Sequence, residues 1–578
     1  MTFSQLVSTF EKIEATSKRL EMFAILSDLF KEADTNEIAQ IIYLLKGELL
    51  PAFHDINIGM SEKYLLRTIA NTTGIASEPL LKQHQILGDI GKTAAQFILK
   101  KECRNPTISE VYSAIYQMAM MNGEGSVDQK IDALSHLFSC LSPVEAKYVA
   151  RFVAGQLRLG SGDATILEAL ALSQGSRTFR PALDRAYNLI SDLGLLAKIY
   201  RQEGEAGVLA IAVRCGYPIR SALCERLPSA EEIIEKIGRC SVEIKYDGFR
   251  CQAHKKENEV ILFSRNQERT TLMFPEIVEA IQSVFHGHDI ILEGEALAVN
   301  ETTGEAFPFQ VTMQRKRKHD IALLAKTVPL KFFLFDLLYL DGEDYTQYPY
   351  HARRNKLISL LPKHPVLEIS EAIETEDPNA VSLFFNDVVE RGYEGIVAKR
   401  LESLYTAGSR NFNWIKLKRS YKGEMTDTLD LCIVGYFFGK GARTKFGIGT
   451  ILVAAYDKEE ARFKTLSKIG TGFTEAELIA LKGLLDPISI PEKPKTLDAK
   501  IVPDVWVVPK FVVTVTADEM TRSRSHTANQ DADGVGLSLR FPRVKGFIRN
   551  DKGHEDSTTT AEIATLFLQQ KRIQLKET

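Results

Sequence analysis

The sequence lacks the short motifs through which many proteins bind nucleotides or metals. It contains no Gly-x-x-x-x-Gly-Lys-[Ser/Thr] phosphate loop and no strand-linked Gly-x-Gly-x-x-Gly. Its seven cysteines form no Cys-x-x-Cys pair, which argues against a structural zinc cluster and favours a reduced, cytosolic protein. If the protein uses a nucleotide, side chains must hold the phosphates.

Long apolar runs and a large net charge are also missing. No apolar run is long enough to span a membrane, and the residues after Met1 have neither the basic nor the apolar region of a secretory signal. The net charge of −3 gives no global sign of nucleic-acid binding. Any such surface must be local, because the field of a charged patch acts over about 8–10 Å. We expect a cytoplasmic protein that has no membrane partner.

The composition is that of a globular protein with several domains. Of the 578 residues, 44% are hydrophobic and 25% charged, and this length predicts about three or four domains. Up to about residue 200, apolar residues recur at helical spacing. The clearest examples are Phe3, Leu6, Val7, Phe10 and Ile13, followed by Phe23, Leu26 and Phe30. The first third is therefore predicted to be all-helical.

A glycine-bounded turn lies inside this helical third. Gly155–Gly160 leads through Ser161-Gly162-Asp163 into the apolar run 164–167. A turn that opens a helix offers free backbone N–H groups for a phosphate. An ordinary connection between two helices has the same spacing, so both interpretations stay open.

The period changes to two after a Gly-, Ala- and Pro-rich boundary at 204–229. Strands are predicted at 241–247, 259–264, 289–299, 330–340, 394–399 and 413–418, with amphipathic helices between them. Beyond about residue 420 the pattern is one of short strands with glycine turns, at 431–437, 450–456, 505–508 and 512–515. This pattern is typical of a small barrel such as an OB-fold. A capping box, Thr559-x-x-Glu562, announces a last helix.

The stretch Glu243–Arg250 contains the strongest candidate for a catalytic residue. It predicts a strand, a tight Asp247-Gly248 turn and a returning strand. Alternation places Glu243 and Lys245 on one face of the first strand. Lysine is a poor core residue but a good covalent nucleophile once its ammonium loses a proton. The alternative is a surface hairpin with an ion pair.

Several other strands carry charged residues that suit phosphate or metal binding. Arg265 ends a strand, and Glu293 and Glu295 share a strand face, where paired carboxylates suit Mg²⁺. Glu394 and Lys399 lie at the two ends of a buried strand. For the carboxylates, a solvated edge strand is the open alternative.

Phe335 and the segment Trp414–Lys418 complete this set. Phe335 ends a buried run, where core packing is favoured over stacking on a base. Trp414, Lys416 and Lys418 share one face, and two like charges there repel unless an anion such as a polyphosphate lies between them. A solvated basic edge explains the lysines equally well.

In order along the chain, these segments resemble the signature of the ATP-dependent DNA ligases of the archaeal and eukaryotic replicative type. The matching segments are Glu243–Arg250, Phe263–Asn266, Leu292–Ala296, Phe335-Asp336, Glu394–Lys399, Arg410 with Trp414–Lys418, and Leu539–Arg543 with its continuation to Lys552 and Glu555–Thr559. The helical third also resembles that family's DNA-binding domain. Phe249 departs from the pattern, because relatives often carry a small or acidic residue there, and it could alter the pocket wall.

The resemblance implies a multidomain fold with three parts. These are an all-α DNA-binding domain (1–210), an α+β adenylation domain (211–420) and a β-barrel OB-fold domain with a C-terminal helix (421–578). It implies that Lys245 attacks ATP to form lysyl-AMP, and that Lys416, Arg265 and bound Mg²⁺ lower the pKa of this lysine. The AMP then passes to a 5′-phosphate at a nick in duplex DNA, where the 3′-hydroxyl displaces it.

The resemblance also assigns roles to the other matching residues. Glu243 binds the adenine amino group, Phe335 stacks on the base, and Arg250, Arg265 and Glu295 bind the ribose and α-phosphate. The residues assigned to phosphate binding are Arg410, Lys416 and Lys418, together with Arg540, Arg543 and Lys552 of a mobile C-terminal lid. Glu394, with Glu295, is assigned to Mg²⁺.

Nicked double-stranded DNA is the expected partner, and we expect the protein to bind mainly to the DNA backbone. The densest basic cluster, Arg315–Lys318, is either a DNA contact or a solvated surface. We expect a monomer; a sliding clamp is a candidate partner, although no clean Gln-x-x-aliphatic-x-x-aromatic-aromatic segment is present. An RNA ligase, a capping enzyme, an NAD-dependent ligase and a catalytically silent DNA-clamping protein are less favoured alternatives.

Overall fold

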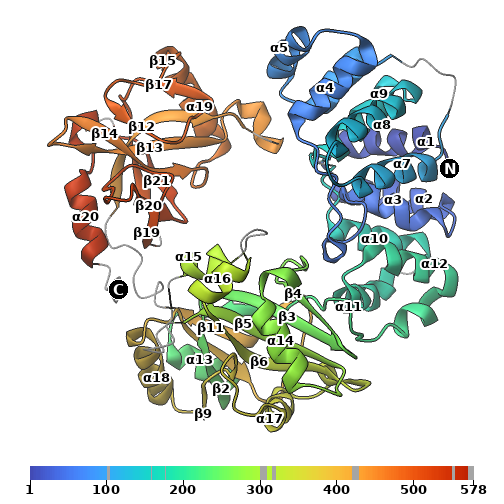
Figure 1. Cartoon of the computed structure of the whole chain (residues 1–578), viewed down its shortest axis with the longest axis vertical. Coiled ribbons are helices and arrows are strands. Elements are labelled where there is room, and N and C mark those ends of the chain that lie inside the picture. The colour runs from blue at the N-terminus through green and yellow to red at the C-terminus, as the bar shows by residue number, and fades with distance from the viewer. Residues whose placement is uncertain are drawn as a thin grey trace. The chain divides into compact units, whose positions relative to one another are not determined.

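The computed structural model describes the chain in two compact units (Figure 1). The described residues are 1–578 except 100–104, 158, 176, 300–306, 308, 316–320, 419–427, 440, 518, 550–552 and 570–578. One unit is Met1–Lys416 and the other is Leu417–Thr578. Among the helices of the described residues, none is long and apolar enough to cross a membrane. The division of the first unit near residue 210 stays a prediction.

The first unit begins with a helical region, as predicted. Its α-helices are α1 (Phe3–Glu14), α2 (Arg19–Glu32), α3 (Glu37–Lys46), α4 (Glu62–Thr73), α5 (Ser77–Leu87), α6 (Ile90–Phe97), α7 (Ile108–Met120), α8 (Ser126–Cys140), α9 (Pro143–Val153), α10 (Asp163–Ser173), α11 (Arg180–Ile190) and α12 (Leu193–Leu209). All five residues of the first apolar series are buried on α1. In the second series Leu26 and Phe30 are buried on α2, whereas Phe23 is half-buried.

The glycine-bounded turn of the helical region connects α9 to α10. Gly155 and Gly160 both have positive φ angles, which glycine adopts without strain. The first residue of α10, Asp163, places its own carboxylate at the helix start, where it pairs with Lys46 (3.4 Å) and Arg220 (3.0 Å). A carboxylate in that position repels a phosphate, so the structure favours an ordinary connection between helices.

The rest of the first unit contains two sheets. The five-stranded sheet has the order β1-β11-β10-β2-β9, and the six-stranded sheet has the order β4-β3-β5-β6-β7, with β8 beside β6. The strands are β1 (Leu223–Arg226), β2 (Cys240–Lys245), β3 (Phe249–Lys256), β4 (Glu259–Ser264), β5 (Ile290–Ala298), β6 (Leu330–Leu340), β7 (Glu343–Asp344), β8 (Leu367–Ile369), β9 (Ala372–Thr375), β10 (Gly395–Arg400) and β11 (Arg410–Lys418). The helices are α13 (Ala230–Ile237), α14 (Pro275–Val284), α15 (Phe309–Gln314), α16 (Ile321–Thr327), α17 (Tyr350–Leu360) and α18 (Pro378–Glu390).

The predicted hairpin at Asp247-Gly248 is wrong. β2 pairs with β9 and β10, whereas β3 pairs with β4 and β5 in the other sheet. A two-residue type I′ hairpin needs positive φ at both central residues, and neither Asp247 nor Gly248 has one. Instead, Gly248 lies so close to β5 that an added Cβ would be 2.4 Å from the Ala296 carbonyl oxygen. The dipeptide therefore carries the chain from one sheet to the other.

Phe249, the residue that departs from the family pattern, is part of the core of the six-stranded sheet. Its ring packs against Phe274, with centroids 5.3 Å apart. Phe274, Ile277 and Ile281 at and after the start of α14 cover this apolar face of the sheet. The expectation that Phe249 alters the wall of a nucleotide pocket is therefore not supported, because alternation along β3 turns it away from Arg250.

The second unit is rich in short strands and is OB-like, as predicted. Its main sheet contains β12 (Leu429–Phe437), β13 (Thr450–Asp457), β14 (Arg462–Ile469), β15 (Ser489–Ile490), β16 (Leu497–Asp498), β17 (Val505–Val507), β18 (Val512–Thr516) and β21 (Arg543–Ile548). β19 (Glu519–Ser523) and β20 (Gly536–Arg540) form a separate pair, and the α-helices among the described residues are α19 (Glu475–Leu485) and α20 (Thr560–Gln569). The capping box is present: Glu562 N donates to Thr559 Oγ1 (3.2 Å), and Thr559 N donates to Glu562 Oε2 (2.7 Å).

Candidate active site

Two crossed ion pairs mark the centre of the five-stranded sheet. β2 and β10 are antiparallel, with Lys245 opposite Gly395 and Glu243 opposite Val397. This register brings the Lys245 ammonium against the carboxylate of Glu394, which immediately precedes β10. Further along the same two strands, Lys399 Nζ of β10 lies 2.9 Å from Glu243 Oε1 of β2. The predicted nucleophile thus has a carboxylate partner and remains partly exposed, at 24% of its side chain.

Carboxylates dominate the electrostatics around Lys245. Burial disfavours its ammonium, but Glu394 and Glu295 outweigh burial and raise the pKa of Lys245 above its ordinary value. The described residues therefore raise this pKa, against the lowering predicted from Lys416 and Arg265, and the predicted effect of bound Mg²⁺ stays a prediction. Burial also raises the pKa of the Glu295 carboxyl to about 7, although Lys245 and Arg250 act in the opposite direction.

Glu243 is buried among donors. Besides Lys399, its Oε1 accepts a hydrogen bond from the Tyr350 hydroxyl and a long one from Arg354 Nη1 (3.4 Å). Lys399 Nζ also donates to the Phe335 carbonyl (3.2 Å) and lies 4.7 Å from the centroid of the Phe335 ring. Glu243 is therefore held next to Phe335, the aromatic residue that the family resemblance assigns to stacking on the base.

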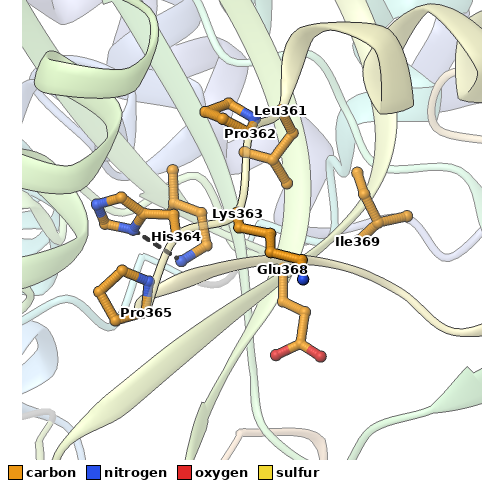
Figure 2. A pocket seen from close by; sticks show the side chains of 8 residues that line it. Leu361, Pro362, Lys363, His364, Pro365, Glu368 and Ile369 are labelled. Carbon is orange, nitrogen blue, oxygen red and sulfur yellow. Dashed lines mark hydrogen bonds between the residues drawn. The ribbon is translucent and has the colours of Figure 1, made fainter.

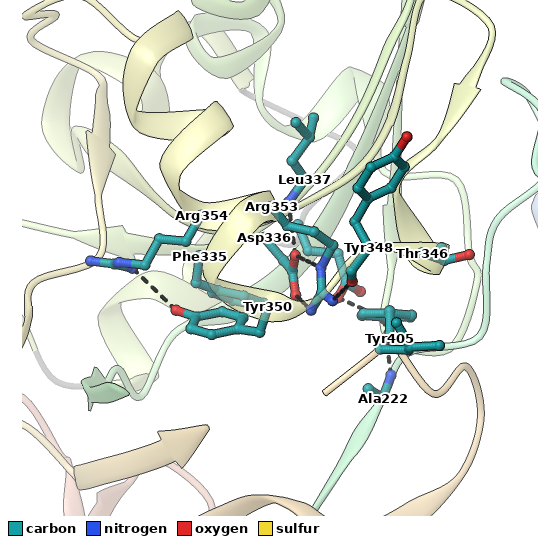
Figure 3. Close-up of polar contacts among 12 residues, drawn as sticks. Ala222, Phe335, Asp336, Leu337, Thr346, Tyr348, Tyr350, Arg353, Arg354 and Tyr405 are labelled. Atoms are coloured by element: carbon teal, nitrogen blue, oxygen red, sulfur yellow. Dashed lines mark hydrogen bonds and ion pairs between the residues drawn. The ribbon is translucent and has the colours of Figure 1, made fainter. Parts of the chain in front are cut away.

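Phe335 is half-buried and packs edge-on against Trp414, with centroids 6.2 Å apart. Its neighbour Asp336 forms a fully buried, two-pronged ion pair with Arg353 of α17 (2.6 and 2.8 Å). Figure 3 shows the Arg353 guanidinium between two tyrosines, Tyr350 and Tyr405; their ring centroids lie 5.6 and 5.7 Å from it. The middle of β6, which carries Phe335 and Asp336, is thereby fixed to α17.

Arg250 lies on the polar face of β3, together with Gln252 and His254. The segment 215–222, here called the strap, runs along this face. Hydrogen bonds join Gly216 N to His254 Nδ1 (3.1 Å), Ile219 N to Gln252 Oε1 (2.7 Å) and Arg250 Nη1 to the Ala222 carbonyl (3.0 Å). The strap therefore fixes one side of the Arg250 guanidinium.

Glu293 fixes the other side of Arg250. Its carboxylate is fully buried and pairs with Arg250 Nη2 at 2.8 Å. It also accepts hydrogen bonds from the hydroxyls of Tyr405 (2.7 Å) and Ser221 (3.1 Å). Glu293 and Glu295 are thus not an equivalent pair of metal ligands: Glu293 is saturated by protein donors, whereas Glu295 accepts no hydrogen bond within the described part of the chain.

The remaining predicted phosphate-binding residues lie at strand ends. Arg265 follows β4 and Arg410 begins β11; both are exposed, and neither forms an ion pair with another described residue. Lys416 and Lys418 are half-buried further along β11. Arg265 and Arg410 can thus bind an incoming anion without breaking an existing pair.

The predicted lid residues belong to the second unit. Arg540 ends β20 and Arg543 begins β21, and Phe541 between them has a positive φ of 51° and a 63% exposed side chain. Lys552 lies outside the described residues. The strained turn presents Phe541 at the surface, with the Arg540 guanidinium 5.2 Å from its ring centroid.

Comparisons with known proteins give the family of the chain along its length. A family model described as "ATP dependent DNA ligase domain" matches residues 221–418, "DNA ligase N terminus" matches 2–171, and "ATP dependent DNA ligase C terminal region" matches 444–552. A "Probable DNA ligase" of Dictyoglomus thermophilum is 48% identical over 100% of this chain and 99% of its own length. The chain belongs to the ATP-dependent DNA ligase family.

Two further comparisons refine this assignment. A DNA ligase of Sulfurisphaera tokodaii is 40% identical over 98% of this chain and 97% of the relative, in line with the predicted archaeal type. The solved structure Pmar-Lig_PreS3 covers 94% of this chain and 99% of its own with a TM-score of 0.56. Because its sequence identity is 18%, this second similarity concerns the fold alone.

One basic residue proposed as a DNA contact of this ligase is part of the core instead. Arg315 is buried and makes a two-pronged pair with Glu276 (2.6 and 2.8 Å), and it also donates to the Val328 carbonyl (2.7 Å). The interpretation of Arg315 as a surface cation is therefore wrong. The rest of the predicted cluster, residues 316–318, lies outside the described residues.

The structure contains a surface pocket beside the six-stranded sheet, and it lies apart from the predicted site residues. It measures about 520 Å³ and lies where α17 leads into β8 (Figure 2). Its lining is Leu361–Pro365 and Leu367–Ile369, which includes none of the predicted site residues. In this structure, the groups around Lys245 are gathered by ion pairs and hydrogen bonds.

Sequence reasoning did not select the buried partners that hold the ligase site. Tyr350, Arg353, Arg354 and Tyr405 lie in no segment chosen for chemistry, yet they fix Glu243, Asp336 and Glu293. One signal was available: Tyr350, Arg353 and Leu357 recur at i, i+3 and i+7, so an arginine falls on the buried face of α17.

Proposed function

We propose that Lys245 is the adenylated residue of this ligase. Its Nζ attacks the α-phosphorus of ATP, a phosphoramidate bond forms, and pyrophosphate leaves. The AMP then moves to the 5′-phosphate of a nick in duplex DNA, and the 3′-hydroxyl displaces it as the strand is sealed. The observation that supports this role is the position of Lys245 at the end of β2, partly exposed and paired with Glu394.

The attack requires a neutral amine, so one proton must leave Lys245 first. The paired carboxylate of Glu394 is in direct contact and is placed to take it.

We propose further that the surrounding residues bind the nucleotide as the family resemblance assigns. Glu243 takes the adenine amino group and Phe335 stacks on the base. Arg250, Arg265 and Glu295 take the ribose and α-phosphate. Arg410, Lys416 and Lys418, together with Arg540, Arg543 and Lys552 of a closing C-terminal lid, take the other phosphates.

Glu295 and Glu394 would hold Mg²⁺. The two carboxylates act on the same lysine. Mg²⁺ is commonly held by one or two carboxylates together with substrate phosphates and waters, so this donor set fits the ion. An ion held there would neutralise charge on the phosphates.

On the DNA side, we propose backbone-dominated, salt-sensitive binding of nicked duplex by a monomer in the cytoplasm, associated with the nucleoid in a prokaryote. Replication, repair and recombination are the expected settings, and a sliding clamp is a candidate partner. Gel filtration of the pure protein, alone and with clamp, tests the oligomeric state and the partner.

The decisive experiment is incubation with α-labelled ATP and Mg²⁺, followed by a denaturing gel. We expect label on the wild type and on the control Lys363→Ala, whose lysine is exposed on the α17–β8 connection, but not on Lys245→Ala. Nicked duplex DNA should discharge the label with sealing. Discharge by RNA ends alone, or label on Lys245→Ala, would contradict the proposal.

A further inference from the structure

We propose that Tyr350 determines base selectivity: its hydroxyl, with Lys399 and Arg354, fixes the Glu243 carboxylate so that one oxygen is left to accept the amino group at position 6 of adenine. The inference rests on the proposed assignment of Glu243 to the base. It adds a residue that lies in none of the matching motifs.

The donors around Glu243 converge on a single oxygen. Lys399 Nζ (2.9 Å), Arg354 Nη1 (3.4 Å) and the Tyr350 hydroxyl all contact Oε1. Oε2 accepts no hydrogen bond from any residue that the structure describes. Because a carboxylate has acceptor positions on both oxygens, this one-sided arrangement pins its rotation and leaves Oε2 for a ligand.

Glu243 is also next to the ring proposed to stack on the base. Lys399 links them: its ammonium binds Glu243, donates to the Phe335 carbonyl and lies 4.7 Å from the Phe335 ring centroid. A base stacked on Phe335 therefore presents its edge close to Glu243.

Tyr350 is held as a donor. It is the first residue of α17, it is fully buried, and the Arg353 guanidinium lies 5.6 Å from its ring centroid. Burial and the Glu243 carboxylate raise the pKa of Tyr350 well above its ordinary value, so the phenol keeps its proton. The bond therefore runs from Tyr350 to Glu243 and not in reverse.

This arrangement distinguishes purine bases by the group at position 6. Adenine carries an amino donor there, whereas inosine carries an oxo acceptor, which a carboxylate oxygen repels. A site built around such a hydrogen bond rejects the analogue that cannot make it. ATP and inosine triphosphate (ITP) are therefore the matched pair of probes.

The test uses the full chain and measures the rate of label transfer from α-labelled ATP and ITP to Lys245. We expect Tyr350→Phe to lower the ATP/ITP ratio of kcat/KM about tenfold, the size expected for one hydrogen bond to a charged group. The loss should appear mainly in KM for ATP, since Tyr350 does not contact the phosphate-binding residues. Arg354→Met, which removes the longest of the three contacts, should shift the ratio less in the same direction.

Tyr348→Phe is the matched control, because its phenol donates to Glu343 at the surface. Equal losses for ATP and ITP in Tyr350→Phe, or an equal shift of the ratio in Tyr348→Phe, would overturn the inference. So would an unchanged ratio in a Tyr350→Phe protein whose Tm matches the wild type. A wild type without label on Lys245 refutes the proposed function itself, whereas a labelled wild type with an unchanged ratio in Tyr350→Phe refutes this inference alone.

Discussion

Replacing Arg353 with methionine should destabilise the first unit strongly. Arg353 and Asp336 both have 0% exposed side chains. Among the described residues, the substitution leaves the buried Asp336 carboxylate with the Leu337 N–H (2.9 Å) as its remaining hydrogen-bond donor. It also removes a donor from the carbonyls of Tyr348 and Ser403. Breaking a buried pair from one side costs about 3–5 kcal/mol. For a unit that spans Met1–Lys416 we expect Tm to fall by about 3–6 °C.

Scanning calorimetry of the full chain checks this value, with Arg391→Met as the matched control. Arg391 makes a similar two-pronged pair with Glu371 (3.0 and 2.8 Å), but both side chains are more than one-third exposed. Such surface pairs contribute about 0–1 kcal/mol. The double variant Asp336→Leu/Arg353→Met should be more stable than Arg353→Met, because no unpaired charge stays buried. Equal Tm changes for Arg353→Met and Arg391→Met would refute the reasoning.

Three further predictions concern the same unit. Gly248→Ala should slow adenylation and cost about 1–3 kcal/mol, because its Cβ would meet the Ala296 carbonyl at 2.4 Å, whereas Gly483→Ala has no neighbour within 4 Å and should not reduce Tm. Burial lowers the pKa of His254 to about 3, so below its ordinary value of 6.5 only the unfolded chain takes the proton. Stability is therefore lost as the pH falls from about 6.5, by about 2 kcal/mol at pH 5, and His254→Gln should remove that share of the loss in calorimetry at pH 7 and pH 5. Glu293→Gln should raise KM for ATP about tenfold in the labelling assay, because it removes the ion pair that orients Arg250; an unchanged KM would contradict this role.

The sequence predicted many elements but not how they pair. The predicted strands 259–264 and 330–340 coincide with β4 and β6, because apolar and β-branched runs bounded by turn residues are a local signal. The choice of sheet for β2 is not local: its partner β10 lies about 150 residues further along the chain. Asp247-Gly248 therefore looked like a hairpin, although the close approach of Gly248 to β5 governs its conformation.

The sequence predicted those site residues that lie in short recognisable motifs, and it did not predict the others. Lys245, Glu243 and Glu394 were selected from short patterns, and their mutual contacts follow from the register of β2 and β10. Tyr350 and Tyr405 could not be selected, because their roles depend on where α17 and the 401–409 turn meet the sheets. The sign of the pKa change at Lys245 was missed for a related reason, since Glu295 approaches it from the other sheet.

The passage of the chain between two sheets has a consequence for folding order. All strands of the six-stranded sheet fall within residues 249–369, between β2 and β9 of the five-stranded sheet, and β2 pairs directly with β9. The six-stranded sheet can thus form from one continuous segment, whereas β2 must wait for partners that emerge from the ribosome later. Because long-range pairing is slow, we expect the nested sheet to gain protection from hydrogen exchange first. Lys245 would then reach its final position only after β10 has been synthesised, so nascent chains that end before residue 395 should not take up AMP.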